Sequence, residues 1–256
     1  MTRKSWFDPN DHSLSVIRPE LQYGSELKLP SKLLMIFAEQ VLGDLKDELD
    51  LYTYPERFTF FGGGCEFYKI RGNRQIGFIE GTIGAPIGSS ALDTAIAKGV
   101  VEVFILGLCG AVSSELKVGD LVIPTEVSRE EGTSFHYAPP EISARPDSST
   151  LLKLQSAISE TEFTVHTGKT VSTDAPYRQT INTEIGWREA GILGVDMEMS
   201  ALFTVAKYRE IPAIGLFVVS DAHDLTGTND WEWNRSLFRE SVRRAVVFLS
   251  NFAQES

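Results

Sequence analysis

A chain of 256 residues is long enough for one large domain with a substantial core, and no Pro/Gly/Ser-rich linker or charge block divides it. Its net charge of -11 argues against a nucleic acid polymer as partner, because such binding needs many Lys and Arg side chains against phosphate. The start of the chain has no apolar core of signal-peptide length, no apolar run reaches the length of a membrane span, and two cysteines are too few for a disulfide framework. We therefore expect a soluble, cytoplasmic protein with no membrane contact.

The first 30 residues are polar and contain three prolines, which predicts an N-terminal arm. Residues 31–256 are then the single domain. His12 is the only histidine of the arm, and a lone histidine in such a position is most often an ordinary surface residue.

Residues 31–49 begin with an apolar stretch that runs into a predicted amphipathic helix, in which Leu42, Leu45 and Leu49 are spaced for one face. Over residues 57–81, alternating aromatic and β-branched residues flank Gly72 and Asn73. This pattern predicts a β-hairpin.

From residue 75 onwards, predicted strands and helices alternate, which indicates an α/β fold with a mostly parallel sheet and helices on both faces. The predicted strands are 75–81, 101–112, 119–132 and a segment within 165–180 that ends in a polar loop, and the predicted helices are 89–99, 148–159 and 235–253.

A further helix is predicted over residues 199–210, because apolar side chains recur there at helical spacing. Asp196 and Glu198 stand at its start. The helix macrodipole and the free N–H groups of a first turn favour an anion, so we expect Glu198 to be ionised. Asp196 is equally well explained as a simple helix cap.

Pro212 stops this helix, and residues 211–220 form an apolar, β-branched run that predicts a strand buried on both faces. Asp221 follows at the carboxyl end of that strand, where α/β sheets bind small ligands. Desolvation there favours the protonated acid, so Glu198 and Asp221 are predicted to be an ion and an acid. An ordinary turn residue is the alternative for Asp221.

The glycines at 81, 84 and 88 lie between a predicted strand and a helix, and they fit an anion-binding turn or a tight structural turn equally well. Their spacing matches neither the dinucleotide fingerprint nor the P-loop, which disfavours a dinucleotide-binding domain. No zinc-type Cys/His cluster and no nucleophile elbow occur, so we expect no metal and no cofactor. Cys109 is predicted to be buried packing.

Six strings occur in the order found in the nucleoside phosphorylase family, and the chain resembles that family from about residue 60 to 224. The resemblance implies a three-layer αβα sandwich around a mixed, mostly parallel twisted sheet, and a homodimer or homohexamer. The middle of the chain is most similar to uridine phosphorylases, whereas Ser220 and Asp221 are more similar to purine nucleoside phosphorylases and to methylthioadenosine nucleosidase. The strings are LGLCGAV, VGDLVIP, REEGTSFHYAPPE, STDAPYRQT, DMEMSAL and VVSDAHD.

The resemblance also implies roles for single residues. Glu198 would accept hydrogen bonds from the ribose 2′- and 3′-hydroxyls, with Met197 lying against the sugar. Asp221 would give a proton or a hydrogen bond to a purine leaving group, so that the base leaves neutral. The other implied roles are the ribose 5′-hydroxyl for His12, the base for Tyr177, Arg178, Gln179 and Ser220, and the acceptor for Gly84, Gly107 and Leu108.

The residues that hold phosphate in the family are missing here. The first segment reads LLMIFAEQVLGD and lacks the family's G-D-P-x-R loop, while Ile105, Leu108 and Cys65 replace other phosphate-binding positions. Desolvating a doubly charged phosphate against such side chains costs several kcal/mol at least. Arginines from another direction are an alternative, namely Arg71, Arg74 or Arg235.

We therefore expect an enzyme of purine salvage that cleaves the N-glycosidic bond of a purine-type nucleoside, with phosphate as the acceptor on family grounds. A nucleosidase that uses water is the alternative, and a nucleoside-binding sensor without turnover is the alternative of another class. Trp231 and Trp233 follow Asp221 closely, and they are predicted to form either a lid over the pocket or ordinary surface packing.

Overall fold

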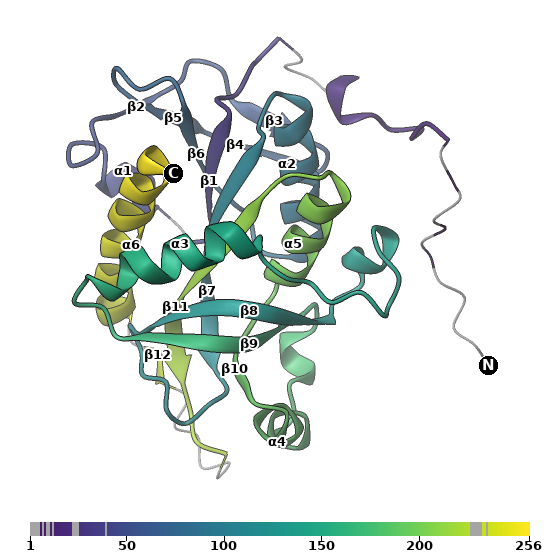
Figure 1. Ribbon diagram of the computed structural model, residues 1–256, viewed down its shortest axis with the longest axis vertical. Coiled ribbons are helices and arrows are strands. Elements are labelled where there is room, and N and C mark those ends of the chain that lie inside the picture. Colours follow the sequence, from purple (N-terminus) through teal and green to yellow (C-terminus); the bar gives the residue numbers. More distant parts are fainter. Residues whose placement is uncertain are drawn as a thin grey trace.

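The structure, a computed structural model, describes residues 6, 8, 11, 13–21, 26–38, 40–225, 232–233 and 235–256 of the chain. A mixed ten-stranded sheet runs through this part in the order β12-β11-β8-β9-β10-β7-β1-β6-β5-β2, and β3 and β4 form a separate pair (Figure 1). The strands are β1 (Lys32–Ile36), β2 (Leu51–Thr53), β3 (Phe58–Phe60), β4 (Gly63–Cys65), β5 (Phe67–Ile70), β6 (Ile76–Glu80), β7 (Glu102–Ala111), β8 (Leu121–Glu130), β9 (Val165–Thr173), β10 (Ile192–Asp196), β11 (Ala213–Ala222) and β12 (Glu232–Trp233). The helices are α1 (Val41–Asp44), α2 (Ala85–Ala97), α3 (Ser148–Ser159), α4 (Ile181–Glu189), α5 (Met199–Tyr208) and α6 (Arg235–Glu255), with short 3-10 turns η1 (Pro19–Leu21), η2 (Thr133–His136) and η3 (Pro176–Arg178).

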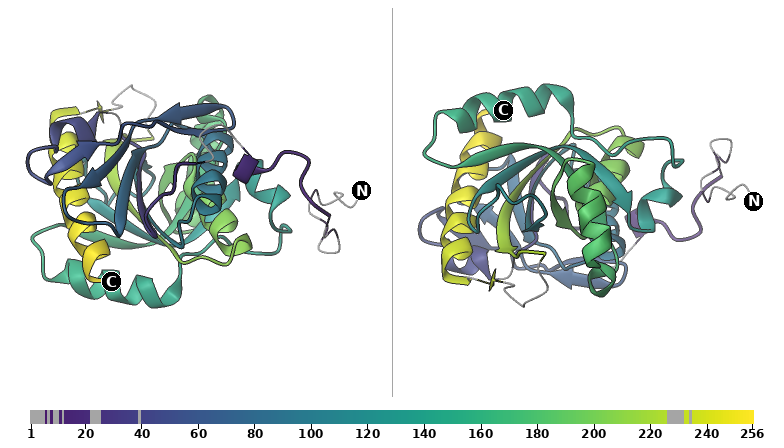
Figure 2. Two further views of the ribbon diagram at one scale, coloured as in Figure 1. Left: turned by 90° about the horizontal axis from the view of Figure 1, so that it is seen from above. Right: turned by 90° about the horizontal axis from the view of Figure 1, so that it is seen from below.

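Helices cover both faces of the sheet, which confirms the expected three-layer αβα fold. Figure 2 shows the sheet between α6 on one side and α2 on the other. The central strands are buried on both faces, so their successive side chains enter different cores. Leu33 and Met35 pack with the α2 and α5 side, whereas Leu34 and Ile36 pack with the α6 side.

Strand β7 is the axis of the sheet because it pairs with three other strands. It runs parallel to β1 and β11, and its last residues pair antiparallel with β10. Gly110, near the carboxyl end of β7, is therefore in register with Val195 on one side and with Asp221 on the other. This pairing brings together two segments that the sequence separates by 25 residues or so.

Most elements of the α/β part are confirmed. Helix α3 spans the predicted residues 148–159, and β5 and β6 form the predicted antiparallel hairpin. Gly72 in its turn has a φ of 77°, a value that glycine adopts without strain. The buried run before Asp221 is strand β11, as predicted.

The segment 31–49, predicted as an apolar start running into an amphipathic helix, contains much less helix than expected. Its aliphatic first part is the central strand β1, and only four residues form α1. A run of aliphatic side chains fits a strand buried on both faces as well as it fits a buried helix, and the parallel partners β6 and β7 decide between them. The leucines predicted to share one face do share one core, namely Leu42, Leu45 and Leu49.

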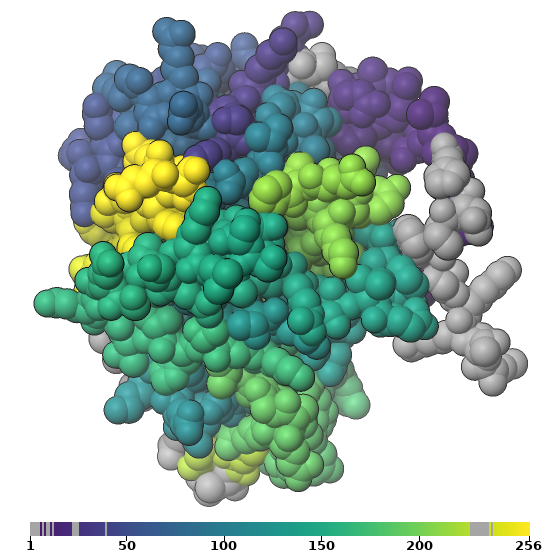
Figure 3. Space-filling view, in the orientation of Figure 1, coloured from purple at the N-terminus to yellow at the C-terminus, as the bar shows by residue number. Residues whose placement is uncertain are grey.

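The arm is described in part, and His12 lies outside the described residues. Residues 13–21 end in the turn η1, which lies against α2 (Figure 3). Leu27 and Leu29, further along, are buried in the core below α2. Within the described ranges, the chain has no helix with the length and apolar character that a bilayer crossing requires.

Candidate active site

The carboxyl end of β7 is where the D-M-E and S-D strings meet. A Cβ on Gly110 would lie 3.0 Å from Oδ2 of Asp221 and 3.5 Å from Cγ1 of Val195. The neighbouring Cys109 is buried, as predicted. Burial, followed by the charges of Asp196 and Asp221, raises the pKa of this thiol well above its usual value. Cys109 is therefore inert packing between two carboxyl groups.

Glu198 lies at the start of helix α5, just after strand β10. It occupies the N-cap position of that helix, and only 7 % of its surface is exposed. Its Oε1 accepts a hydrogen bond of 2.6 Å from the backbone N–H of Gly84. Gly84 has a φ of 110°, which favours glycine, and this conformation begins helix α2. The glycine turn and the D-M-E string therefore form one local structure.

Asp196 is buried, and its carboxylate is bonded to the backbone at the start of α5. Its Oδ2 accepts hydrogen bonds from the backbone N–H groups of Glu198 (2.9 Å) and Met199 (2.6 Å). Its Oδ1 accepts the hydroxyl of Ser172, which in turn accepts the N–H of Ser200 at 2.9 Å. The interpretation of Asp196 as a cap is confirmed by these bonds, and they fix the entry into α5.

The pKa of Glu198 is shifted in the direction opposite to the one predicted from its place in the first turn. Burial, followed by the nearby charge of Asp196, raises this pKa to about 8. Burial also raises the pKa of Asp196. A first-turn position favours an anion by only about 0.3–1 kcal/mol, which is less than the cost of taking a carboxylate out of water.

Asp221 lies at the end of β11, half-buried above Gly110. The hydroxyl of Ser220 is buried and donates to Oδ1 of Asp221 at 2.6 Å. Strand β12 pairs with Asp221 and Ala222, so the segment predicted as a lid does border the site through its backbone. Trp231 and the side chain of Trp233 lie outside the described residues, and the lid stays a prediction.

The loop predicted to read the base follows β9. Tyr177 in η3 is 99 % exposed, and Arg178 is exposed as well. Gln179 Nε2 instead donates to Oε2 of the buried Glu184 at 3.0 Å. Nε2 of His223 lies 2.8 Å from the same oxygen.

Glu184 therefore ties the loop to the end of β11, and this tie was missed in the sequence. His223 stands two residues after Asp221 in the resembling string, which was the one available signal. The base-reading roles of the loop residues stay predictions.

A cavity of about 820 Å³ lies beside the glycine turn, and Leu108 is among its lining residues. Gly84 follows directly after its Gly81–Ile83 rim. We call it the acceptor cavity because acceptor binding is predicted for Leu108 and Gly84, and these roles stay predictions. Gly107 is not part of its lining: a Cβ there would lie 3.0 Å from the ring of Phe217, in the core. The lining residues are Phe37, Ala38, Gln40, Val41, Glu80, Gly81, Thr82, Ile83, Leu108, Phe238, Arg239 and Val242.

Two charged residues of this cavity were missed in the sequence, Glu80 and Arg239. Arg71 was one of the candidates, but it lies elsewhere with its Nε 3.2 Å from Asp50. The side chain of Arg235 is outside the described residues. No three His, Cys, Asp or Glu side chains gather into a possible metal site in the described part of the chain.

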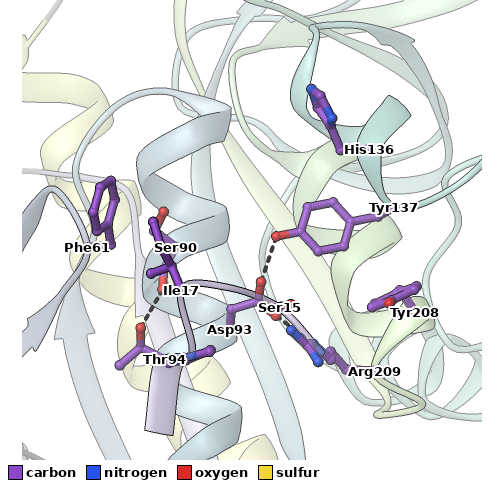
Figure 4. Close-up of a pocket in the computed structure, with 11 residues that line it drawn as sticks. Ser15, Ile17, Phe61, Ser90, Asp93, Thr94, His136, Tyr137, Tyr208 and Arg209 are labelled. Atoms are coloured by element: carbon purple, nitrogen blue, oxygen red, sulfur yellow. Dashed lines mark hydrogen bonds and ion pairs between the residues drawn. The ribbon is translucent and has the colours of Figure 1, made fainter. Parts of the chain in front are cut away.

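A second cavity, of about 400 Å³, lies between the arm and α2 (Figure 4). Asp93 in its wall accepts hydrogen bonds from the hydroxyl of Tyr137 at 2.6 Å and from Nε of Arg209 at 2.7 Å. Among the described residues, none of those predicted at the nucleoside site lines this cavity.

Comparisons with known proteins agree with the resemblance. The sequence profile described as the phosphorylase superfamily matches residues 34–255. A guanosine phosphorylase of Halorubrum lacusprofundi is 33% identical over 172 residues, which are 66% of this chain and 71% of that protein.

Two solved structures have the same fold. The uridine phosphorylase from Vibrio fischeri ES114 has a TM-score of 0.76 at 19% identity, covering 89% of this chain and 93% of that one. An AMP nucleosidase from Bacteroides thetaiotaomicron has a TM-score of 0.68 at 23% identity, covering 89% and 88%. The family profile and the shared fold together mean that this chain belongs to the phosphorylase superfamily of nucleoside phosphorylases and nucleosidases.

Proposed function

We propose that this protein cleaves the N-glycosidic bond of a purine-type nucleoside. The observation that carries the proposal is that the segments bearing Glu198 and Asp221 meet at Gly110, near the carboxyl end of β7. Val195 of β10, three residues before Glu198, and Asp221 of β11 are both in register with Gly110. In this proposal the ribose lies against Glu198 and Met197, and the base lies towards Asp221 and the loop of Tyr177.

Glu198 acts on the sugar in this scheme. A neutral carboxyl both accepts and donates hydrogen bonds, so it suits the two hydroxyls of a ribose. As the C1′–N bond lengthens, positive charge develops on the ribose and lowers the pKa of a neighbouring carboxyl. Glu198 therefore binds the transition state more strongly than the ground state, which is the condition for catalysis.

Asp221 acts on the leaving group. A proton or a hydrogen bond from its carboxyl to the base allows the base to leave without negative charge, an effect worth about 10²–10⁴-fold in rate. The buried Ser220 fixes the side chain through its hydroxyl. The similarity to a guanosine phosphorylase supports a purine as the base.

The test is base release from guanosine, inosine, adenosine and uridine, with and without phosphate. In the Asp221→Asn variant we expect kcat to fall by about 10²–10⁴-fold while nucleoside binding persists. Glu102→Gln is a control with the same loss of charge at the opposite end of β7. A wild-type protein that binds nucleosides but releases no base with either acceptor would be a sensor, and the proposed enzyme would be excluded.

Phosphate is the co-substrate that the family suggests, and water is the second candidate. Water is favoured by a specific observation: the acceptor cavity contains a carboxyl group, Glu80, and the apolar Leu108. The sugar product distinguishes the two acceptors: water gives free ribose, and phosphate gives ribose 1-phosphate.

A further inference from the structure

Glu80 is the last residue of β6, and its carboxyl group is at the acceptor cavity. Its Oε1 accepts a hydrogen bond of 2.7 Å from the backbone N–H of Leu42. The N–H groups of Val41 and Gln40 also bond to this carboxyl. The amides at the start of α1, which an acceptor anion would need, are therefore already bonded to an acid of the chain itself.

Among the described residues, the charges around the cavity do not suit phosphate. Arg239 is the cation of the cavity lining among the described residues, and its guanidinium lies 3.5 Å from Oδ2 of Asp44. A phosphate dianion would enter beside the Glu80 carboxylate, and like charges at such short range repel each other by several kcal/mol when they are partly buried. A neutral acceptor meets no such repulsion.

Glu80 has the properties of a base. Burial raises its pKa above the usual range, while the hydrogen bonds from the three amides oppose this and favour the ionised form. A carboxyl group with a raised pKa binds a proton more readily than a surface carboxylate does, which suits it to remove a proton from water.

The chain also places Glu80 close to the sugar position. Only Gly81, Thr82 and Ile83 separate it from Gly84, whose N–H bonds to Glu198. Even fully extended, four residues span at most about 14 Å between Cα atoms. Leu108 of the same cavity precedes Gly110 by two residues in β7, beneath Asp221. The inference therefore assigns the acceptor to Glu80, the ribose to Glu198 and the base to Asp221.

We propose that water is the acceptor and that Glu80 is its general base. This inference rests on the proposed function, and it assigns the acceptor end of the same site. The oxygen of a water molecule in the cavity bonds to C1′ of the ribose while Glu80 takes one of its protons. The C1′–N bond breaks with its electron pair going to the base, which receives a proton or hydrogen bond from Asp221. The products are free ribose and free base, and solvent returns both carboxyl groups to their starting states.

The test compares wild type, Glu80→Gln and Glu102→Gln with guanosine in phosphate-free buffer. The amide oxygen of the first variant still accepts the Leu42 hydrogen bond, but it cannot take a proton. We expect wild type and Glu102→Gln to form free ribose at equal rates. We expect Glu80→Gln to lose about 10²–10⁴-fold in kcat with KM little changed. The wild-type rate should also fall as the pH falls through the pKa of Glu80, and this acid limb should be absent in the variant.

The outcomes separate this inference from the proposed function. If wild type releases base only with phosphate and forms ribose 1-phosphate, the enzyme stands and the role of Glu80 falls. If Glu80→Gln keeps the wild-type hydrolytic rate, Glu80 is only a cap of α1. If wild type releases no base with either acceptor, the proposed function itself fails.

A second variant covers the case in which the first does not fold. Glu80→Ala opens space beside the α1 amides, and formate supplies a small carboxylate in that space. Formate should restore part of the hydrolysis in Glu80→Ala and should not accelerate wild type. If folded Glu80→Ala protein shows no loss of hydrolysis, the proposal is overturned. If neither variant folds, analysis of the wild-type products still tests whether water is the acceptor.

Discussion

The wall of the arm-side cavity and the nucleoside site hold their carboxyl groups in opposite ways. Asp93, beside the arm, is neutralised by Arg209 and hydrogen-bonded to Tyr137 (Figure 4). Glu198 is more deeply buried, yet no Lys or Arg of the described chain forms an ion pair with it, and the backbone N–H groups of Gly84 and Met197 donate to its carboxyl group. A cation fixes a carboxylate in its charged form, whereas burial against amides leaves it able to change its charge. The difference distinguishes a structural carboxylate from one suited to chemistry.

Neutral substitutions at the two positions give the largest expected contrast. Glu198→Gln should lower kcat/KM for nucleoside cleavage by about 10³-fold, equivalent to about 4 kcal/mol, because an amide cannot respond to charge on the ribose. Asp93→Asn removes charge from an equally well-bonded carboxylate and should leave kcat/KM unchanged. Steady-state kinetics on both variants checks the contrast, and an equal loss in both would remove it.

The buried hydrogen bonds of Asp196 should contribute more to the free energy of unfolding than those of an exposed capping residue. Asp196→Ala leaves two backbone N–H groups and one hydroxyl buried without an acceptor, so we expect the free energy of unfolding to fall by about 3 kcal/mol. Asp147→Ala is the matched control, because Asp147 caps α3 near the surface and should cost about 1 kcal/mol. Urea unfolding of the two variants measures both values. Equal losses would mean that burial of the Asp196 network adds nothing.

Glu198 should also make stability depend on pH. Its folded pKa of about 8 lies above the ordinary 4.5, so the folded state binds a proton more tightly than the unfolded chain. The resulting stabilisation is full below pH 4.5 and is lost as the pH rises through about 8.

The Glu198→Gln variant lacks this titration. The melting temperature of Glu198→Gln relative to wild type should therefore rise between pH 5 and pH 9, by about 3 °C or more if the effect is at least about 1 kcal/mol. Glu102→Gln, measured in parallel, should show no such trend. A constant difference between Glu198→Gln and wild type across this range would contradict the raised pKa.

Much of the fold was predictable from local patterns. Buried strands such as β7 and β11 are apolar throughout, and helices such as α3 have clear periodicity and a capping residue. The first strand was not predictable in this way, because aliphatic residues alone do not distinguish a central strand from a buried helix. The short strand β10 was missed as well, although it leads directly into the D-M-E string.

Some features of the candidate site were likewise predictable from the sequence, and others were not. The sequence by itself determined the family and the residue types at positions 196–198 and 220–221, and it predicted that the family's phosphate-binding residues are missing, because these are properties of short strings. Only the tertiary structure decided that Glu198 has a raised pKa, that Glu184 ties the base loop to His223, and that Glu80 lies at the acceptor cavity. Burial and hydrogen bonding between distant segments set these properties, and neither is encoded in the spacing of residues along one segment.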